Sequence, residues 1–358
     1  MKVTIVFAFR DREVSRVLRS LDSLKTQSNK NFDVLFVDYG SKPVLAIEIS
    51  SVVSQYDFVQ YSYLYTQYQP WNKSKALNYA LNQTITDFFF VADIDMIFRA
   101  DFIEIALQQS VNLHKNIYFK VGYLSKEEST STKEFEKYVI QSESNHEATG
   151  LTLFYTSNLK NIGGFDNFFH FWGSEDTEVH VRLRNAGFDI YFYDEQILLL
   201  HQWHSSYMRS ERKTLKTDLQ LRDVIKLNFN HLNNAISTKK KVVNQVKSEI
   251  NKNDFLELID DKNIASVLNI KHDFTYFLFV VLPNFEKGIL KVNFTKDPFS
   301  KTLKFYIKRL LRKKVPEYYS LKEINDQLLL HIVSFYHHFP YIYQVSNDLK
   351  SITFAIKK

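Results

Sequence analysis

Short apolar runs, each followed by polar residues, constrain the fold of this chain more than any other feature of its sequence. Val3–Phe9, Phe32–Val37 and Phe88–Ala92 are such runs, and Phe58–Tyr65 is a fourth segment of similar character. Their length predicts buried β-strands. Between the runs, apolar residues recur every three or four positions, which predicts helices. Strands that alternate with helices are typical of an α/β fold with a largely parallel sheet.

Polar residues directly follow three of the predicted strands. They are residues 9–12, 38–41 and 93–95. In open α/β sheets, ligands bind beyond the carboxyl ends of the strands. We therefore expect these three loops to lie at one edge of the sheet and to form a binding site there.

The third loop and a later pair of histidines contain groups that bind divalent cations. Asp93 and Asp95 alternate along an extended segment, so both carboxylates point to the same side and can bind a hard cation with its diphosphate. A solvated turn after a strand is the alternative. His201 and His204 follow a strand expected over Tyr191–Leu200. Either histidine could complete a metal site with Asp95, and their spacing does not decide which one. A structural role is the alternative for each.

A second acidic pair follows a tryptophan and a glycine. Glu175 and Asp176 come after Trp172 and Gly173, at the start of a helix expected over Asp176–Leu183 and ending near Gly187. A tryptophan beside a glycine can stack on a sugar ring while the carboxylates accept hydrogen bonds from its hydroxyls. Capping of a helix N-terminus by acids is the alternative.

The first two loops offer groups for a nucleotide. Arg10 and Arg12 could bind phosphate or base, and surface salt bridges are an equally weighted alternative. Asp38 could accept a hydrogen bond from a uracil or a ribose. A turn-forming aspartate before Gly40 is the alternative for that residue.

The chain of 358 residues contains no cysteine, so disulfides and thiolate chemistry are excluded and a reducing compartment fits. Its longest late apolar stretch, Phe277–Leu282, is far shorter than the roughly 20 residues of a transmembrane helix. The first apolar run is too short for a signal peptide. We therefore expect a cytoplasmic protein without a membrane-spanning segment. Residues 122–148 are polar and are expected to form a long loop with some helix.

The charge of the chain is unevenly distributed. Residues 1–210 hold 20 Lys/Arg and 25 Asp/Glu, whereas residues 211–358 hold 26 and 15. After about residue 211, predicted strands and helices no longer alternate regularly. Together with the charge asymmetry, this predicts two domains, 1–210 and 211–358, the second a mainly helical α+β extension. Within it, Lys301–Lys314 has seven Lys/Arg, no acid and apolar residues near one helical face. A membrane-surface helix is one interpretation, and an ordinary helix with a buried apolar face is slightly favoured. No nucleic-acid recognition motif is present.

Five segments in this order resemble inverting GT-A glycosyltransferases of the β-1,4-galactosyltransferase type, and related bacterial chondroitin-polymerase-like and family 2 enzymes. Phe-Arg-Asp-Arg at 9–12 resembles the nucleotide loop of that family. Trp-Asn-Lys-Ser-Lys-Ala-Leu-Asn at 71–78 is similar to its Phe-Asn-Arg-Ala-Lys-Leu-Leu-Asn segment. Residues 87–97 resemble its strand ending in Asp-Val-Asp. Gly163-Gly164-Phe165 and Trp-Gly-Ser-Glu-Asp at 172–176 resemble its last block. The resemblance covers about residues 3–210.

This resemblance implies a GT-A fold, the Rossmann-like mixed sheet with flanking helices of nucleotide-diphospho-sugar transferases. It implies Mn²⁺ or Mg²⁺ at Asp95 with His204 or His201, and Asp93 near the ribose or the metal. Asp176 would be the catalytic base and Glu175 a sugar-hydroxyl acceptor. The implied residues of the nucleotide-sugar site are Phe9, Arg10, Arg12, Asp38, Lys75, Asp93, Trp172 and Gly173.

The implied reaction is transfer of a hexose or N-acetylhexosamine from a UDP-sugar to a hydroxyl of a glycan or lipid-linked glycan, with inversion. A bacterial cytoplasmic enzyme of surface polysaccharide synthesis, peripheral at the inner face of the cell membrane, is the expected setting. Three departures from the family leave the donor and the metal geometry open. Ser174 replaces a glycine, Thr177 replaces an acid, and His201 stands where the animal enzymes have methionine. A GT-A-like protein that binds glycans or nucleotide sugars without catalysis is the alternative.

Overall fold

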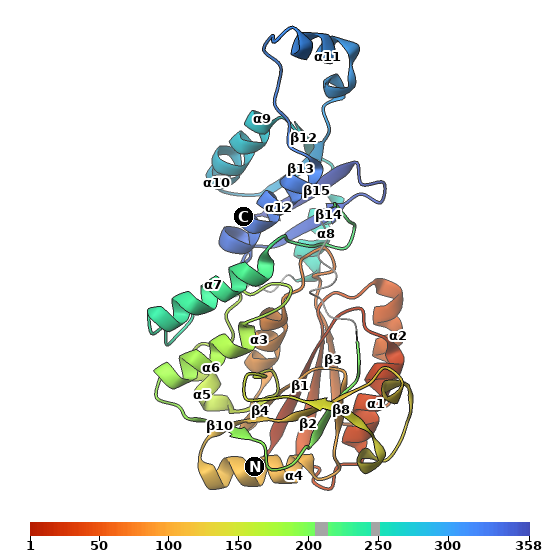
Figure 1. The fold of residues 1–358 in the computed structure, drawn as a ribbon, viewed down its shortest axis with the longest axis vertical. Helices are drawn as coiled ribbons and strands as arrows, with labels where there is room; N and C mark the ends of the chain where they lie inside the picture. The colour runs from red at the N-terminus through yellow and green to blue at the C-terminus, as the bar shows by residue number, and fades with distance from the viewer. Residues whose placement is uncertain (205–213, 245–250) are drawn as a thin grey trace. The chain divides into compact units, whose positions relative to one another are not determined.

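The computed structural model describes residues 1–204, 214–244 and 251–358, which form two compact units (Figure 1). Of the described residues, unit 1 comprises 1–67, 71–204 and 225–244, and unit 2 comprises 68–70, 214–224 and 251–358. The domain boundary expected between residues 210 and 211 lies outside the described residues. The structure assigns residues 225–244 to unit 1 and residues 68–70 to unit 2.

Unit 1 is built around a seven-stranded mixed sheet with the strand order β10-β6-β9-β4-β1-β2-β3. The central strand β1 is parallel to β2 and to β4, whereas β9 is antiparallel to both of its neighbours, β4 and β6. The α/β fold with a mixed sheet is thereby confirmed. The strands are β1 (Val3–Phe9), β2 (Phe32–Asp38), β3 (Val59–Tyr63), β4 (Phe88–Ala92), β6 (Asn116–Phe119), β9 (Thr152–Tyr155) and β10 (Ile190–Tyr193).

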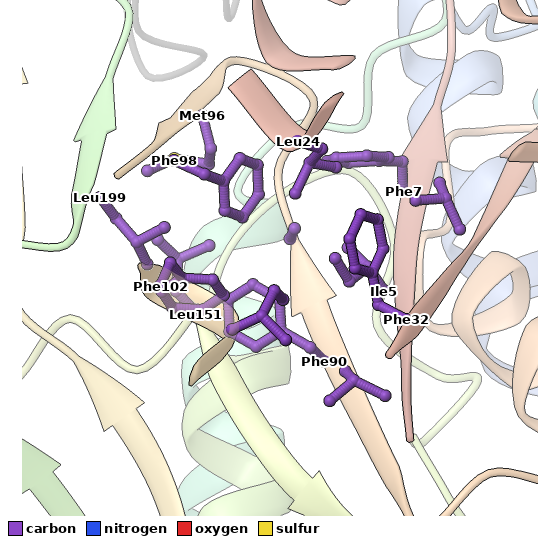
Figure 2. Close-up of a cluster of buried hydrophobic side chains, with 14 of the residues drawn as sticks. Ile5, Phe7, Leu24, Phe32, Phe90, Met96, Phe98, Phe102, Leu151 and Leu199 are labelled. Carbon is purple, nitrogen blue, oxygen red and sulfur yellow. The ribbon is translucent and has the colours of Figure 1, made fainter. Parts of the chain in front are cut away.

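Helices cover both faces of this sheet, which explains why its central strands are apolar throughout. Along β1, Ile5 and Phe7 pack on one face, whereas Val6 packs on the other. Side chains of α1 (Val14–Lys25), α2 (Pro43–Val53) and α4 (Phe102–Leu113) join the first core cluster. Side chains of α3 (Lys73–Gln83), α5 (Thr156–Asn161) and α6 (Glu175–Asn185) join the second. Figure 2 shows the first cluster, where Phe90 lies among other aromatic rings, with its ring centroid 5.0 Å from that of Phe102.

A second, four-stranded sheet of unit 1 has the order β5-β11-β7-β8. Its strands are β5 (Met96–Phe98), β11 (Leu199–His201), β7 (Val121–Leu124) and β8 (Ile140–Glu143). The single strand expected over Tyr191–Leu200 is therefore wrong. Its first half is β10 in the large sheet and its end is β11 in the small one, because polar residues 194–196 interrupt the apolar run.

The long polar loop expected over residues 122–148 is also wrong in part. This segment contributes most of β7, all of β8 and two short 3₁₀ helices, η1 (Glu128–Thr130) and η2 (Phe135–Lys137). Its few apolar residues supply the burial that orders it. Leu124 and Tyr138 pack with Ile97 and Leu200 in a small separate core.

Unit 2 has a four-stranded sheet with the order β12-β13-β15-β14 and several helices, as expected for an α+β extension. Its strands are β12 (Ile264–Leu268), β13 (Ile289–Thr295), β14 (Tyr341–Val345) and β15 (Ser351–Lys357). Its helices are α8 (Lys252–Asp260), α9 (Lys271–Tyr276), η4 (Phe277–Val281), α10 (Leu282–Asn284), η5 (Pro298–Lys301), α11 (Leu303–Leu310), α12 (Leu321–His331) and η6 (Ile332–Tyr336). The helix α7 (Val224–Ser237) begins at the boundary between the units. In the described part of the chain, no helix is both long and apolar enough to cross a membrane.

The helix expected within Lys301–Lys314 forms as α11, but the apolar face predicted for it is not buried in a core. Leu303 and Leu310 are 76% and 83% exposed, and Tyr306, Ile307 and Leu311 are exposed as well. The slightly favoured interpretation, an ordinary helix with a buried apolar face, is therefore wrong. Periodicity defines an apolar face without deciding whether another element covers it.

Candidate active site

Asp95, His201 and His204 converge in unit 1. The Nε2 atoms of His201 and His204 lie 3.5 Å and 3.4 Å from the two carboxylate oxygens of Asp95. One ligand atom of each residue lies within 4.8 Å of the others. Pairing of β11 with β5 sets Met96 opposite His201, and the backbone N–H of Gln202 donates to the carbonyl oxygen of Asp95 at 2.9 Å. Sheet pairing thus brings together residues that are more than 100 positions apart.

The donor set at Asp95 fits a divalent cation. Asp95 is only 3% exposed, and its Oδ1 accepts no hydrogen bond from the described residues. Buried carboxylate oxygens are normally satisfied, and the distances to both histidines are longer than good hydrogen bonds. Two ligand atoms on one cation lie about 3–4 Å apart, given bonds of about 2.1 Å. A carboxylate with two imidazoles at this spacing is a suitable ligand set for Mn²⁺ or a similar ion.

Asp93 lies next to Lys73, which the sequence did not single out. The Lys73 ammonium lies 3.0 Å from one Asp93 oxygen and 3.6 Å from an oxygen of Asp176. Burial disfavours the charged form of Asp93, but Lys73 and the two histidines together outweigh this effect and lower the pKa of that carboxyl. Lys73 is the first residue of α3, so the start of this helix connects the loop after β4 with the acidic pair at the start of α6.

The acidic pair is partly buried at the first turn of α6. Burial and then the charge of Asp176 raise the pKa of Glu175 to about 7. Burial likewise raises the pKa of Asp176, although the Lys73 charge opposes this shift. Two neighbouring carboxyls in a desolvated site resist full ionisation, which is typical of acid–base sites. Gly150 leaves room beside them, because a Cβ at this position would lie 3.2 Å from Asp176 Oδ2.

The loop before the acidic pair has an unusual backbone. Phe171 and Ser174 have positive φ angles of 63° and 72°, and Gly173 has a φ of 100°. Such conformations are costly for non-glycine residues and cluster at functional sites. The side-chain amide of Asn228 in α7 holds this loop by donating to the backbone oxygens of His170 and Trp172, each at 3.0 Å.

A buried ion pair fixes the rest of α6. Glu178 and Arg182 have no exposed side-chain surface, and Arg182 Nε donates to Glu178 Oε1 at 2.7 Å. The same guanidinium donates to the backbone oxygens of Ile162 and Gly164. These contacts attach α6 to the segment around Gly163-Gly164-Phe165. Sequence reasoning missed this pair, because charged residues four apart on a helix are normally solvent-exposed.

Trp172 and Gly173 are accessible to a ligand from solvent. Trp172 is 49% exposed, and no atom lies within 4 Å of a Cβ built on Gly173. A small pocket beside them is lined by Lys73, Phe169, His170, Phe171, Trp172 and Glu175. Lys75 is two residues after Lys73 in α3 and therefore on another face of the helix. Its ammonium is buried, which lowers its pKa to about 7.

The predicted nucleotide residues differ in what they contact. Arg10 donates through Nη2 to the backbone oxygens of Thr66 and Gln67 at 3.1 Å and 2.8 Å. Arg12 is exposed. Phe9 is fully buried and packs against Phe36, with ring centroids 5.1 Å apart. Arg10 therefore shapes the loop at residues 66–67, and Arg12 is the more accessible of the two arginines.

Asp38 is fully buried at the end of β2. Its two carboxylate oxygens accept hydrogen bonds from the backbone N–H of Ser41 at 2.7 Å and from the hydroxyl of Tyr61 at 2.9 Å. Burial raises the pKa of Asp38 despite these bonds. These contacts describe the turn-forming aspartate considered from the sequence, and a contact between Asp38 and a ribose or uracil stays a prediction.

Gly40 should be required for the packing of this loop. It has a φ of +75°, and a Cβ there would lie 2.3 Å from the backbone nitrogen of Gln67. Gly187 also has a positive φ, of +89°, but has nothing within 4 Å of a Cβ. We expect Gly40→Ala to destabilise the protein by roughly 2–5 kcal/mol, the sum of left-handed strain and overpacking. Gly187→Ala, the matched control, should cost only about 1–2 kcal/mol. Urea denaturation measures both, and equal losses would contradict the close approach.

Activity should depend on the protonation of Glu175. If its carboxylate accepts a sugar hydroxyl, kcat/KM should rise as the pH increases through about 7, and Glu175→Gln should remove that inflection. A raised carboxyl pKa stabilises the fold at low pH, and this contribution is lost as the pH rises through 7. Glu175→Gln should therefore be more stable than the wild type at pH 8, by roughly 1–3 kcal/mol. Glu195→Gln, at an exposed acid, is the control. A pH profile that is identical in Glu175→Gln and the wild type would refute this assignment.

Part of this site lies in a segment that is similar to a known family. A family model described as the N-terminal domain of galactosyltransferase matches residues 130–204. The matched segment, about a fifth of the chain, contains Trp172, the acidic pair and both histidines. This match supports the resemblance of the chain to GT-A glycosyltransferases that the sequence motifs indicated. The matched segment lies within unit 1, which carries the mixed sheet and the candidate site.

Solved structures with similar chain traces include three glycosyltransferase complexes. S. aureus TarS 1–349 with UDP-GlcNAc is 16% identical, with a TM-score of 0.47 over 67% of this chain and 66% of that one. Mannosyltransferase PcManGT from Pyrobaculum calidifontis, with GDP-Man and Mn²⁺, is 15% identical, with a TM-score of 0.40 over 56% of each chain. GalNAc-T7 with UDP, GalNAc and Mn²⁺ is 13% identical, with a TM-score of 0.43 over 56% of this chain and 43% of that one. The chain spans only 37% of the longer TarS chain. No curated protein sequence matches it.

Proposed function

We propose that unit 1 moves a hexose or N-acetylhexosamine from a UDP-sugar to a hydroxyl of a glycan acceptor, with inversion at the anomeric carbon. The observation that supports this proposal is the arrangement around Lys73. Lys73 contacts Asp93, in the same loop as the Asp95 ligand set, and also Asp176 in the acidic pair. A cation site and a basic carboxylate are therefore close enough to act on one donor and one acceptor.

The residues divide into three groups by their proposed roles. Asp95, His201 and His204 would hold Mn²⁺ or Mg²⁺, which neutralises the charge that develops on the departing diphosphate. Asp176 is the proposed base that takes the proton from the acceptor hydroxyl. Lys73 keeps Asp176 more readily ionised by opposing the effect of burial on its pKa. The exposed ring of Trp172 offers a stacking surface for a sugar, and Glu175 can accept a hydrogen bond from a sugar hydroxyl.

The proposed setting is synthesis of a bacterial surface polysaccharide, with a glycan or a lipid-linked glycan as acceptor. Because the sequence contains no cysteine, the protein fits the reducing cytoplasm, where sugar nucleotides are available as donors. The inner face of the cell membrane is the proposed location for an enzyme that acts on a lipid-linked acceptor.

Two measurements test this function. Calorimetry of UDP with and without Mn²⁺ should show tighter UDP binding when Mn²⁺ is present, because the cation and the diphosphate bind together. Incubation with UDP-Gal, UDP-GalNAc, UDP-Glc and UDP-GlcNAc in Mn²⁺ should then release UDP from one of them by slow hydrolysis. Binding of UDP or glycan without hydrolysis of any donor would instead favour a binding protein that has lost catalysis. UDP affinity that does not respond to Mn²⁺ would contradict the proposed cation site.

A further inference from the structure

Helix α11 presents exposed apolar side chains beside a cluster of positive charges. We use the name α11 surface for its exposed apolar residues, which are Leu303, Tyr306, Ile307, Leu310 and Leu311. Leu303, Ile307 and Leu310 follow the spacing i, i+4, i+7, so they share one face of the helix. Contiguous exposed apolar residues on a folded protein mark an interaction surface more often than isolated ones do.

The opposite side of α11 anchors it to unit 2. Phe305, two residues after Leu303 and therefore on another face, is only 7% exposed. Its ring packs against Phe299 and Tyr318, with centroid distances of 5.8 Å and 5.7 Å. Thr302 caps the helix by accepting a hydrogen bond from the backbone N–H of Phe305 at 3.2 Å. The helix is therefore held in place by one aromatic residue while its larger apolar face points to solvent.

The charged residues in the segment that contains α11 have one sign. Residues 301–314 include seven Lys/Arg and no Asp/Glu. Lys308 and Arg309 lie in the last turn of α11. Arg312, with a φ of 51°, reverses the backbone after the helix, and the N–H of Lys313 donates to the carbonyl of Lys308 at 2.9 Å. This hydrogen bond ends the helix, and the basic residues Arg312 and Lys313 follow directly after its last turn.

We infer that the α11 surface docks on a bilayer that contains anionic lipids, with Leu303, Ile307 and Leu310 entering the boundary between headgroups and acyl chains. Charge complementarity identifies this occupant, because juxtamembrane clusters of Lys/Arg are attracted to anionic headgroups. The exposed apolar face favours a bilayer over a nucleic acid as the partner. Leucine side chains can be buried among lipid acyl chains, whereas a phosphate backbone offers them no apolar contact. The inference rests on unit 2 alone, so it can fail or hold independently of the proposed transferase activity.

Vesicle cosedimentation of the full chain tests the electrostatic part. The protein should sediment with phosphatidylcholine vesicles that contain about one third phosphatidylglycerol, and added salt should release it. Replacement of Lys308, Arg309, Arg312 and Lys313 by Gln should lower the partition coefficient by roughly 10²- to 10³-fold. A matched control replaces four exposed lysines of the same unit, Lys252, Lys262, Lys287 and Lys350, by Gln, and it should lose far less. No binding by the wild type, or equal losses in both variants, would overturn the inference.

The apolar part separates a bilayer from other polyanions. Leu303→Ser with Leu310→Ser should weaken vesicle binding by about tenfold or more, because less apolar area is buried. Val44→Ser with Ile85→Ser removes equally exposed apolar residues from unit 1 and is the control. All four side chains are exposed, so the variants should keep the wild-type thermal transition, which circular dichroism checks. If the leucine variant binds as the wild type does, the surface recognises polyanions in general, and the bilayer assignment is wrong.

Discussion

Asp95→Ala should reduce sugar transfer by roughly 10³-fold or more, because the cation that neutralises the diphosphate loses its anionic ligand. Asp95 is the carboxylate on which His201 and His204 converge. In the presence of Mn²⁺, the UDP affinity of Asp95→Ala should be lower than that of the wild type. In EDTA, the UDP affinities of the two proteins should be equal. Calorimetry in both conditions measures this difference, and single-turnover assays measure transfer.

The design of this experiment must separate metal loss from unfolding, because Asp95 is buried. Asp95→Asn preserves the side-chain volume and should show the same metal-dependent loss with a smaller change in thermal stability. His201→Ala and His204→Ala test which imidazole is needed, a question that spacing leaves open. Asp57→Ala, at an exposed acid of the same unit, is the control. If Asp95→Ala retains wild-type turnover, the cation site is wrongly assigned.

Asp176→Asn should lower turnover by roughly 10²- to 10⁴-fold, the usual contribution of a general base. The amide keeps the shape of the side chain but cannot take a proton. UDP affinity in Mn²⁺ should stay within a few-fold of wild type, because Asp176 is not among the proposed ligands of the cation. This combination distinguishes Asp176 from Asp95, whose loss should affect UDP binding and turnover together.

Glu175→Gln is the necessary companion to this variant, because the two acids are adjacent and their roles could be exchanged. It should raise the requirement for donor or acceptor sugar as well as reducing turnover. Asp194→Asn, at an exposed acid in unit 1, controls for a change of charge alone. Loss of UDP binding in Asp176→Asn as severe as in Asp95→Ala would place Asp176 in the nucleotide site and refute its role as base.

Several parts of the fold follow directly from local sequence. The strands β1, β2 and β4 were predictable because a strand covered by helices on both faces must be apolar throughout. The break between β10 and β11 was not predicted, because the polar residues 194–196 that separate them do not by themselves show that the two halves join different sheets. Only the partners of each half, β6 and β7, distinguish the two cases.

The candidate site shows the same division. Carboxylates after β4 and an acidic pair after Trp172 and Gly173 could be recognised, because they follow strong strand or turn signals. Lys73 could not be chosen over Lys75 from the sequence. Its contact with Asp93 and Asp176 depends on how α3 is rotated against the sheet.

By itself, the sequence determined the alternation of strands and helices, the position of the acidic and histidine groups along the chain, and the amphipathic character of residues 301–314. These are local properties, set by side-chain periodicity and by the chemistry of each residue. The tertiary structure alone decided that Asp95 meets His201 and His204, that Glu178 and Arg182 are buried, and that α11 buries Phe305 while exposing its leucines. These outcomes depend on which segments, far apart in the sequence, pack together. The free energies of burial and strand pairing between such segments cannot be inferred from local sequence patterns.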